Sequence, residues 1–211
     1  MDTCNYVIYI IFAFYSKKPL KSVSLYAIMT RYSNYQAHKK LKLQIYTAAK
    51  TALGGISLKA YTTENIRNVA IAGHGGRGKT TLAEAMLYLS GSSDRLGRVA
   101  DGNTVLDFDA EEKRRKVSVS SAMAYIEWNN KKVNIIDSPG LFDFEGGRSE
   151  ALRACETAVV VLAAGGGVDV GAEKALRAAG RRGLSKFIAV TKCDAENADF
   201  YKTLDALKEQ Y

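Results

Sequence analysis

The fold is decided by Gly73-His74-Gly75-Gly76-Arg77-Gly78-Lys79-Thr80, a stretch that fits the pattern G-x-x-x-x-G-K-[ST]. Glycines let successive backbone N–H groups approach phosphate oxygens, and the helix that follows adds its positive N-terminal dipole. Lys79 is expected to reach the β- and γ-phosphates, and the Thr80 hydroxyl is expected to ligate Mg²⁺. For His74, an unconstrained position of the pattern, we expect a backbone role only. The stretch predicts a phosphate-binding loop.

Around this loop, short β-branched runs alternate with helical periods from Tyr61 onward. Strands are expected at residues 68–72, 117–128, 132–136, 158–162 and 187–191. Helices are expected at residues 79–90, 147–155, 171–181 and 199–210. Asn129-Asn130 indicates a tight hairpin between two of the strands. The pattern predicts an α/β fold, with a mostly parallel sheet, one antiparallel edge hairpin and helices on both faces.

A second motif, Asp137-Ser138-Pro139-Gly140, follows the expected strand at residues 132–136. Asp before Pro-Gly is also ordinary turn chemistry, but here it ends a strand about sixty residues after the phosphate loop. The Asp137 carboxylate is expected to hold Mg²⁺ from the side opposite Thr80, and the Gly140 N–H to contact the γ-phosphate. The loop at residues 141–147 is expected to order or relax with that phosphate.

Between the two motifs lies a polar, basic loop at residues 91–116, long enough to suggest a function. Ser118 follows the loop and could offer a second hydroxyl to Mg²⁺. The alternative is that residues 117–120 alternate inward and outward on a strand and that Ser118 has no ligand.

A third motif, Thr191-Lys192-Cys193-Asp194, ends the expected strand at residues 187–191 and fits the pattern [NT]-K-x-D. The Asp194 carboxylate only accepts hydrogen bonds, so it suits the N1–H and N2–H₂ donors of guanine and leaves adenine unpaired. The Lys192 stem is expected to lie along the purine face. The three motifs together favour GTP over ATP.

The net charge of +8 is confined to residues 1–60, which hold nine Lys or Arg and one acidic residue. Residues 61–211 carry no net charge, so no DNA binding is expected. The apolar run at residues 6–15 is about ten residues long, whereas a membrane span needs roughly twenty. We expect residues 1–60 to be a basic, poorly ordered extension; contact with RNA or an acidic membrane surface and a mis-set start codon are alternatives. The three cysteines have no C-x-x-C spacing, which is typical of reduced thiols.

The three motifs, in this order, make residues 59–211 resemble the G domain of translational GTPases, with elongation factor G and its divergent paralogues most similar. The resemblance also rests on residues 65–74, on Phe142-Asp143-Phe144 and on Gly165-Gly166-Gly167-Val168. It implies GTP, Mg²⁺ and the ribosome as partners and a monomeric cytoplasmic GTPase, in which Lys79, Gly140 and Leu141 occupy catalytic positions. It places Ser118 with Thr80 and Asp137 as magnesium ligands. The implied nucleotide contacts are Gly73, His74, Gly75, Gly76, Arg77, Gly78, Lys79, Thr80, Thr81, Asp137, Ser138, Pro139, Gly140, Leu141, Thr191, Lys192, Cys193 and Asp194.

The sequence departs from that family at three points. Leu141 stands where the family has a histidine that orients water, so intrinsic hydrolysis is expected to be slow. Thr191 replaces the usual asparagine. The G domain is expected to be truncated, because the chain stops before the family's last strand and its small base loop. Three hypotheses stay open: a slow GTPase switch, a GTP-responsive binding module with negligible hydrolysis, and a non-functional truncated gene product with an exposed sheet edge.

Overall fold

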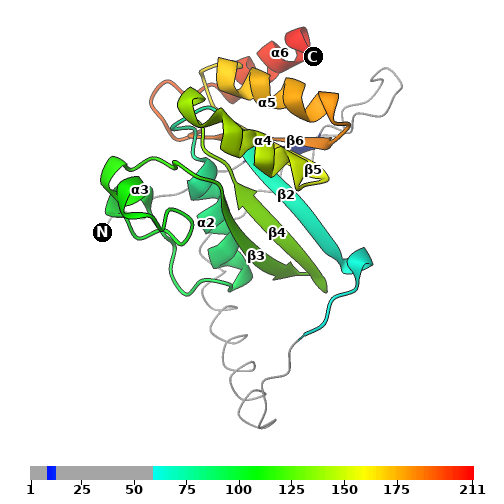
Figure 1. Ribbon diagram of the computed structural model, residues 1–211. Coiled ribbons are helices and arrows are strands. Elements are labelled where there is room, and N and C mark those ends of the chain that lie inside the picture. Colours follow the sequence, from blue (N-terminus) through cyan, green and yellow to red (C-terminus); the bar gives the residue numbers. More distant parts are fainter. Residues whose placement is uncertain (1–8, 13–58) are drawn as a thin grey trace.

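One sheet organises the chain in the computed structural model, which describes residues 9–12 and 59–211 (Figure 1). The strand order is β1-β6-β5-β2-β4-β3. The strands are β1 (Tyr9–Phe12), β2 (Ile66–Gly73), β3 (Ala122–Trp128), β4 (Lys131–Asp137), β5 (Thr157–Ala163) and β6 (Ser185–Thr191). The helices are α2 (Lys79–Ser90), α3 (Ala110–Arg115), α4 (Glu145–Arg153), α5 (Val170–Arg181) and α6 (Phe200–Gln210). Short 3₁₀ turns occupy Thr63–Asn65, Val99–Asp101 and Phe142–Phe144.

The centre of the sheet is parallel, as predicted. β2 pairs in parallel with β4 and β5, and β5 pairs in parallel with β6. The predicted antiparallel hairpin joins β3 to β4, and Asn129 and Asn130 both have positive φ, at 47° and 60°. Two residues of positive φ give the turn a twist that matches the right-handed twist of the strands. The fold class predicted from the sequence is therefore confirmed.

The opposite edge of the sheet holds a strand that the sequence analysis did not predict. β1 pairs antiparallel with β6, with Tyr9 opposite Val190 and Phe12 opposite Phe187. The pairing satisfies backbone groups on the outer edge of β6, which an edge strand otherwise leaves open. The expectation of poor order covered residues 1–60, and of these, residues 1–8 and 13–58 lie outside the described residues.

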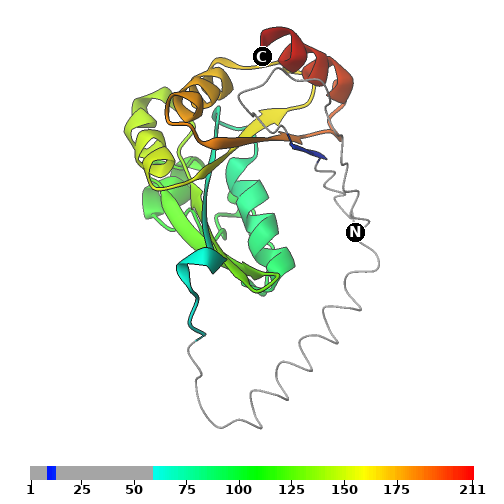
Figure 2. The same cartoon turned by 90° about the vertical axis from the view of Figure 1, so that its right-hand side faces the viewer.

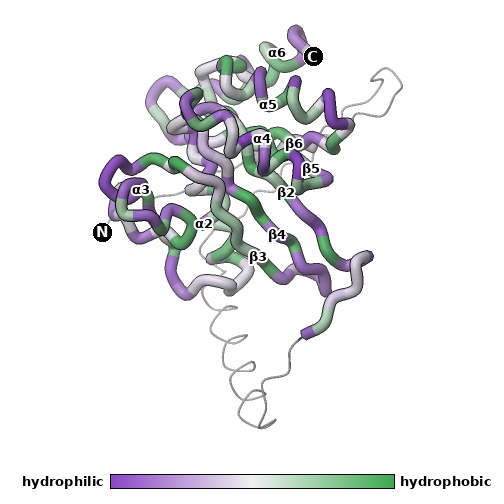
Figure 3. The backbone as a smooth tube through the Cα atoms, viewed as in Figure 1, coloured by the Kyte–Doolittle hydropathy of each residue, from purple (hydrophilic) through white to green (hydrophobic). Residues whose placement is uncertain are grey.

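The helices cover both faces of the sheet, and the alternation of side chains along each strand decides which residue meets which helix. Ile71 of β2 packs against Leu82 and Leu87 of α2, whereas its neighbour Ala72 packs in the cluster that contains Leu176 of α5. Figure 2 shows α2 on the opposite side of the sheet from α4 and α5. Figure 3 shows hydrophobic segments within β4, whose Ile135 belongs to the same buried cluster as Leu82 and Leu87 of α2.

The region after the polar loop differs from the prediction. The strand expected at residues 117–128 begins only at Ala122. The reason is that Val119 and Ser120 donate their backbone N–H groups to the Glu112 carboxylate, at 2.9 and 3.1 Å, and not to a neighbouring strand. Within the loop, Asp109 caps α3 through a capping box, a short helix that the sequence analysis missed. In the part of the chain that the structure describes, no helix is long and apolar enough to cross a membrane.

Candidate functional site

The predicted phosphate-binding loop, residues 73–80, lies between β2 and α2, as expected from the sequence. β2 ends at Gly73, and α2 begins at Lys79 with Gly78 as its N-cap residue. Gly78 has a φ of 83°, a conformation that residues with a Cβ rarely adopt. This turn aims the open N-terminus of α2 at the loop, so orphan backbone donors and the helix dipole converge there.

Lys79 is almost completely buried, and its side chain turns back over the loop. Its Nζ donates to the His74 carbonyl oxygen at 2.9 Å. Burial lowers the pKa of the Lys79 ammonium, and the nearby Asp137 carboxylate opposes that shift. A desolvated lysine held at the mouth of a helix N-terminus is a strong partner for an anion.

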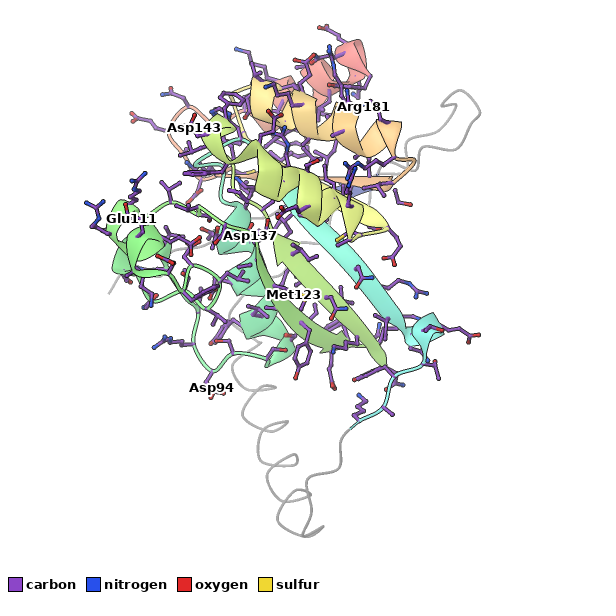
Figure 4. All side chains as sticks on the ribbon, in the orientation of Figure 1. Asp94, Glu111, Met123, Asp137, Asp143 and Arg181 are labelled. Atoms are coloured by element: carbon purple, nitrogen blue, oxygen red, sulfur yellow. The ribbon has the colours of Figure 1, made fainter. Side chains whose placement is uncertain are left out.

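Beside Lys79, oxygen atoms from three separate segments come together. The Thr80 hydroxyl donates to Asp137 Oδ2 at 2.6 Å, and it lies 3.1 Å from the Ser118 hydroxyl. Ser118 in turn donates to Asp107 Oδ1 at 2.7 Å. Figure 4 shows the labelled Asp137 at the end of β4, near the start of α2. The three predicted magnesium ligands, Thr80, Ser118 and Asp137, are thus neighbours.

Asp107 is the member of this group that the sequence analysis missed. It belongs to no motif, and it lies in the loop at residues 91–116, where the pattern gave only polarity and charge. The structure buries it at 4% exposure. Its one sequence signal is its place between two apolar residues, Leu106 and Phe108, and that pattern also occurs in ordinary loops.

The oxygen group has the chemistry that a divalent cation needs. Asp137 Oδ1 and Asp107 Oδ2 are both buried and have no hydrogen-bond partner within residues 9–12 and 59–211. Burial raises the pKa of Asp137 to about 7 and also raises the pKa of Asp107. Two carboxylates and two hydroxyls, with oxygen atoms only, form a donor set that suits Mg²⁺. The residues present therefore fit the ion that the sequence implied.

The second motif lies in close contact with the phosphate-binding loop. A Cβ placed on Gly140 would overlap Lys79 Nζ and would lie 2.7 Å from the Gly75 nitrogen, so only glycine fits. The Leu141 side chain extends over Gly75 and is 39% exposed. Because it is a hydrocarbon, it offers no atom that could orient a water molecule.

Two predicted nucleotide contacts use their side chains elsewhere. The buried Ser138 hydroxyl donates to the Ile71 carbonyl oxygen at 2.7 Å and so fastens the motif to β2. The His74 ring packs edge-on against Phe142, with ring centroids 5.6 Å apart, and its buried Nδ1 has no hydrogen-bond partner in the described part of the chain. His74 thus links the phosphate-binding loop to the 3₁₀ turn that follows Leu141.

The third motif is tied to the phosphate-binding loop by one hydroxyl. Thr191 Oγ1 lies 2.7 Å from the Arg77 carbonyl oxygen and 3.0 Å from the Leu162 carbonyl oxygen, and it donates to them. Lys192 has a φ of 55°, so the chain turns sharply after β6, and Asp194 is exposed. A threonine at this position therefore makes the loop-to-loop hydrogen bond through its hydroxyl.

Arg77 also fixes the loop from its other side. Its Nε pairs with Asp169 Oδ2 at 3.0 Å, and Asp169 Oδ1 accepts the Ala172 N–H as the N-cap of α5. One carboxylate therefore joins the start of α5 to the phosphate-binding loop. Nothing in the sequence motifs pointed to this contact, because the pattern leaves position 77 free.

Comparisons with known proteins match the part of the chain that carries this site. The model of the elongation factor Tu GTP binding domain matches residues 64–211. An elongation factor G of Granulibacter bethesdensis is 39% identical over 147 residues, which are 70% of this chain and 21% of that protein. A mitochondrial ribosome-releasing factor 2 of Yarrowia lipolytica is 39% identical over 143 residues, which are 68% of this chain and 18% of that protein.

A crystal structure of a protein from Thermus thermophilus has a TM-score of 0.66 at 41% identity, and the match covers 69% of this chain and 22% of that one. The chain thus spans about a fifth of the length of the curated relatives it matches. The domain model covers well over half of this chain. The protein therefore belongs to the translational GTPase family that carries the elongation factor Tu GTP-binding domain.

Proposed function

We propose that this chain is a Mg²⁺-dependent switch that binds GTP, hydrolyses its γ-phosphate bond and acts in translation on the ribosome. The observation that carries the proposal is the convergence of Lys79, Thr80, Asp137 and Ser118 at the N-terminus of α2. The names of the relatives, an elongation factor G and a ribosome-releasing factor 2, support the ribosomal part.

Each residue of the site has a defined task in this proposal. Lys79 and the N–H groups around Gly78 bind the phosphate oxygens and stabilise the charge that develops on them. Thr80, Ser118 and Asp137 would hold Mg²⁺, with Asp107 as a further oxygen donor. When bound, the ion would neutralise charge on the β- and γ-phosphates.

Recognition of the base is assigned to the third motif. The Asp194 carboxylate accepts from the N1–H and N2–H₂ groups of guanine, and the Lys192 stem covers the ring face. Thr191 keeps this motif at a fixed distance from the phosphate-binding loop, because its hydroxyl bonds to Arg77. The same polypeptide segment therefore sets the spacing between base and phosphate.

Intrinsic hydrolysis is proposed to be slow. The family's water-orienting position is Leu141, whose hydrocarbon side chain lies beside Gly75. This observation also favours a second candidate function, in which the chain responds to GTP binding and release with negligible hydrolysis. Single-turnover hydrolysis, measured with and without ribosomes, separates the two. Leu141→His is expected to raise the rate, and an unchanged rate would mean that another group positions the water.

The decisive test of the proposed function is equilibrium titration of the full chain with fluorescent GDP and ADP, in the presence and absence of Mg²⁺. We expect GDP to bind, Mg²⁺ to tighten it, and ADP to bind far more weakly. Asp194→Asn should reduce the preference for guanine, whereas Glu196→Gln, an exposed neighbour, should leave it unchanged. Equal affinity of the unaltered chain for GDP and ADP would refute the base assignment.

A further inference from the structure

Glu84 of α2 is a carboxylate that is completely buried, at 0% exposure, and the proposed function gives it no task. Its Oε1 accepts two backbone N–H groups, from Val105 at 2.7 Å and from Leu106 at 3.0 Å. Its Oε2 is buried and has no hydrogen-bond partner among the described residues. A buried carboxylate destabilises the folded state unless hydrogen bonds or opposite charges compensate for its lost hydration. The burial of Glu84 therefore needs a physical reason.

The loop at residues 91–116 closes around this carboxylate from two sides. On one side are the amides of Val105 and Leu106. On the other side is Gly97, where a Cβ would overlap Glu84 Oε2 and would lie 2.8 Å from the Thr104 Cα. The loop therefore packs closely around the Glu84 side chain. The carboxylate accepts backbone N–H groups that would be paired with another backbone group in a helix or strand.

The segment that Glu84 holds is the one that carries Asp107. The Asp107 N–H donates to Thr104 Oγ1 at 3.3 Å, which makes residues 104–107 one compact turn. The Asp107 carboxylate then accepts the Ser118 hydroxyl, which lies next to Thr80. A displacement of the turn would thus move Asp107 away from the oxygen group beside the phosphate-binding loop.

A second buried carboxylate holds the other side of the same oxygen group. Glu112, at 1% exposure, accepts the N–H groups of Val119 and Ser120, directly after Ser118. Asp107 and Ser118 are therefore each flanked by backbone that a buried glutamate anchors. Glu84 belongs to α2, the helix that begins at Lys79, so its anchor connects the loop rigidly to the phosphate-binding element.

We propose that Glu84 is a positioning residue for the nucleotide site: by anchoring residues 104–107 to α2, it sets the place of Asp107 beside Thr80 and so slows the Mg²⁺-dependent release of nucleotide. Glu84 acts through Asp107 and does not itself touch the ligand. This inference rests on the proposed function, because it assumes that the oxygen group holds the cation of a bound guanine nucleotide.

The first test measures release of fluorescent GDP from the full chain, with Mg²⁺ and with a chelator. Glu84→Ala is expected to speed release in Mg²⁺ by about tenfold, because it leaves two amides without their acceptor. In the chelator the rate should equal that of the unaltered chain. Glu84→Gln keeps an acceptor oxygen and should restore most of the difference. Glu150→Gln, on the exposed face of α4, is the matched control and should change nothing.

A merely structural role predicts a different pattern. In that case Glu84→Ala would lower the unfolding temperature, but the ratio of release rates with and without Mg²⁺ would stay the same, and the proposal would be overturned. The combination of Glu84→Ala with Asp107→Asn separates the routes further. If Glu84 acts through Asp107, the double variant releases nucleotide no faster than Asp107→Asn alone, whereas multiplicative effects contradict the proposal.

Hydrogen exchange tests the anchor without any nucleotide. The amides of Val105 and Leu106 should exchange faster in Glu84→Ala than in the unaltered chain, while amides of α6 keep their rates. If the Val105 and Leu106 amides exchange at the same rates in the variant and the unaltered chain, the anchor is refuted. Should Glu84→Ala fail to fold, Gly97→Ala displaces the carboxylate while retaining it, and it should produce the same changes. A chain that binds no GDP at all refutes the proposed function, whereas normal GDP binding with unaltered release in these variants refutes only the role of Glu84.

Discussion

The contacts of Asp169 with Arg77 and with the start of α5 allow a prediction of how much each contact contributes to the free energy of unfolding. Asp169 has two separable tasks, because one carboxylate oxygen caps α5 through the Ala172 N–H at 2.9 Å and the other pairs with Arg77 at 3.0 Å. The side chains are 30% exposed for Arg77 and 13% exposed for Asp169, so the pair is only partly screened by water. Substitutions at the two positions can therefore remove the tasks one at a time.

An N-cap carboxylate contributes about 1 kcal/mol, and a partly exposed ion pair contributes about 0.5–1 kcal/mol. Asp169→Ala should thus lower the free energy of unfolding by about 2 kcal/mol. Asp169→Asn keeps a cap of similar strength and loses the charge, so it should cost about 0.5–1 kcal/mol. Arg77→Met keeps the apolar stem of the side chain and should cost about as much as Asp169→Asn.

Urea denaturation of the full chain, followed by circular dichroism, measures these values. The double variant Arg77→Met with Asp169→Asn should cost less than the sum of the single variants, by roughly the energy of the pair. Arg177→Met removes an exposed pair with Glu173 on the same helix and serves as the control, with an expected change below about 0.5 kcal/mol. Equal losses for Asp169→Asn and Asp169→Ala would show that the cap contributes nothing, and strict additivity would refute the ion pair.

Three further predictions concern the site and one buried thiol. Thr191→Val removes the hydroxyl that joins the third motif to the phosphate-binding loop. The dissociation constant for GDP, measured by calorimetry, should therefore rise by about fivefold, and Thr191→Ser should restore the original value. Gly140→Ala places a methyl group against Lys79, so nucleotide affinity should fall by about tenfold or more; unchanged affinity would contradict the close approach. Burial raises the pKa of the Cys155 thiol to about 11, so alkylation followed by mass spectrometry should be slow at pH 8 and should accelerate as the pH approaches 11 or when the chain is unfolded. Fast labelling of Cys155 at pH 8 in the folded chain would refute that burial.

The three motifs could be read from the sequence because each combines a local backbone requirement with a place at the end of a strand. Gly78, for example, must adopt positive φ where α2 begins, and Asp137 must lie at the end of a strand. Both requirements are expressed within a few residues. The sheet centre was also predictable from local sequence, since residues 158–163 of β5 are all apolar.

Apart from the local capping box of α3, the contacts that the sequence did not reveal join residues far apart in the chain. Glu84 meets Val105, and Arg77 meets Asp169, at separations of 21 and 92 residues. A buried glutamate in a helix looks the same in sequence as an exposed one, because neither the helical period nor the composition records what the side chain accepts. The sequence did not reveal the place of Asp107 in the oxygen group for the same reason.

These long-range contacts bear directly on how such a switch would be timed. If Leu141 leaves hydrolysis slow, the lifetime of the bound state depends mainly on how fast the nucleotide leaves. In the proposed function, release would require the oxygen group at Thr80 and Ser118 to open. The backbone on both sides of that group is held by the carboxylates of Glu84 and Glu112. A partner could displace the turn at residues 104–107 without touching the nucleotide, because the apolar side chains of Val105 in it and Phe108 next to it are exposed, at 48% and 65%. A partner that binds these side chains and pulls the turn from α2 would accelerate release, whereas one that presses the turn against α2 would prolong the bound state. Control of the switch would then depend on loop position and not on the rate of the chemical step.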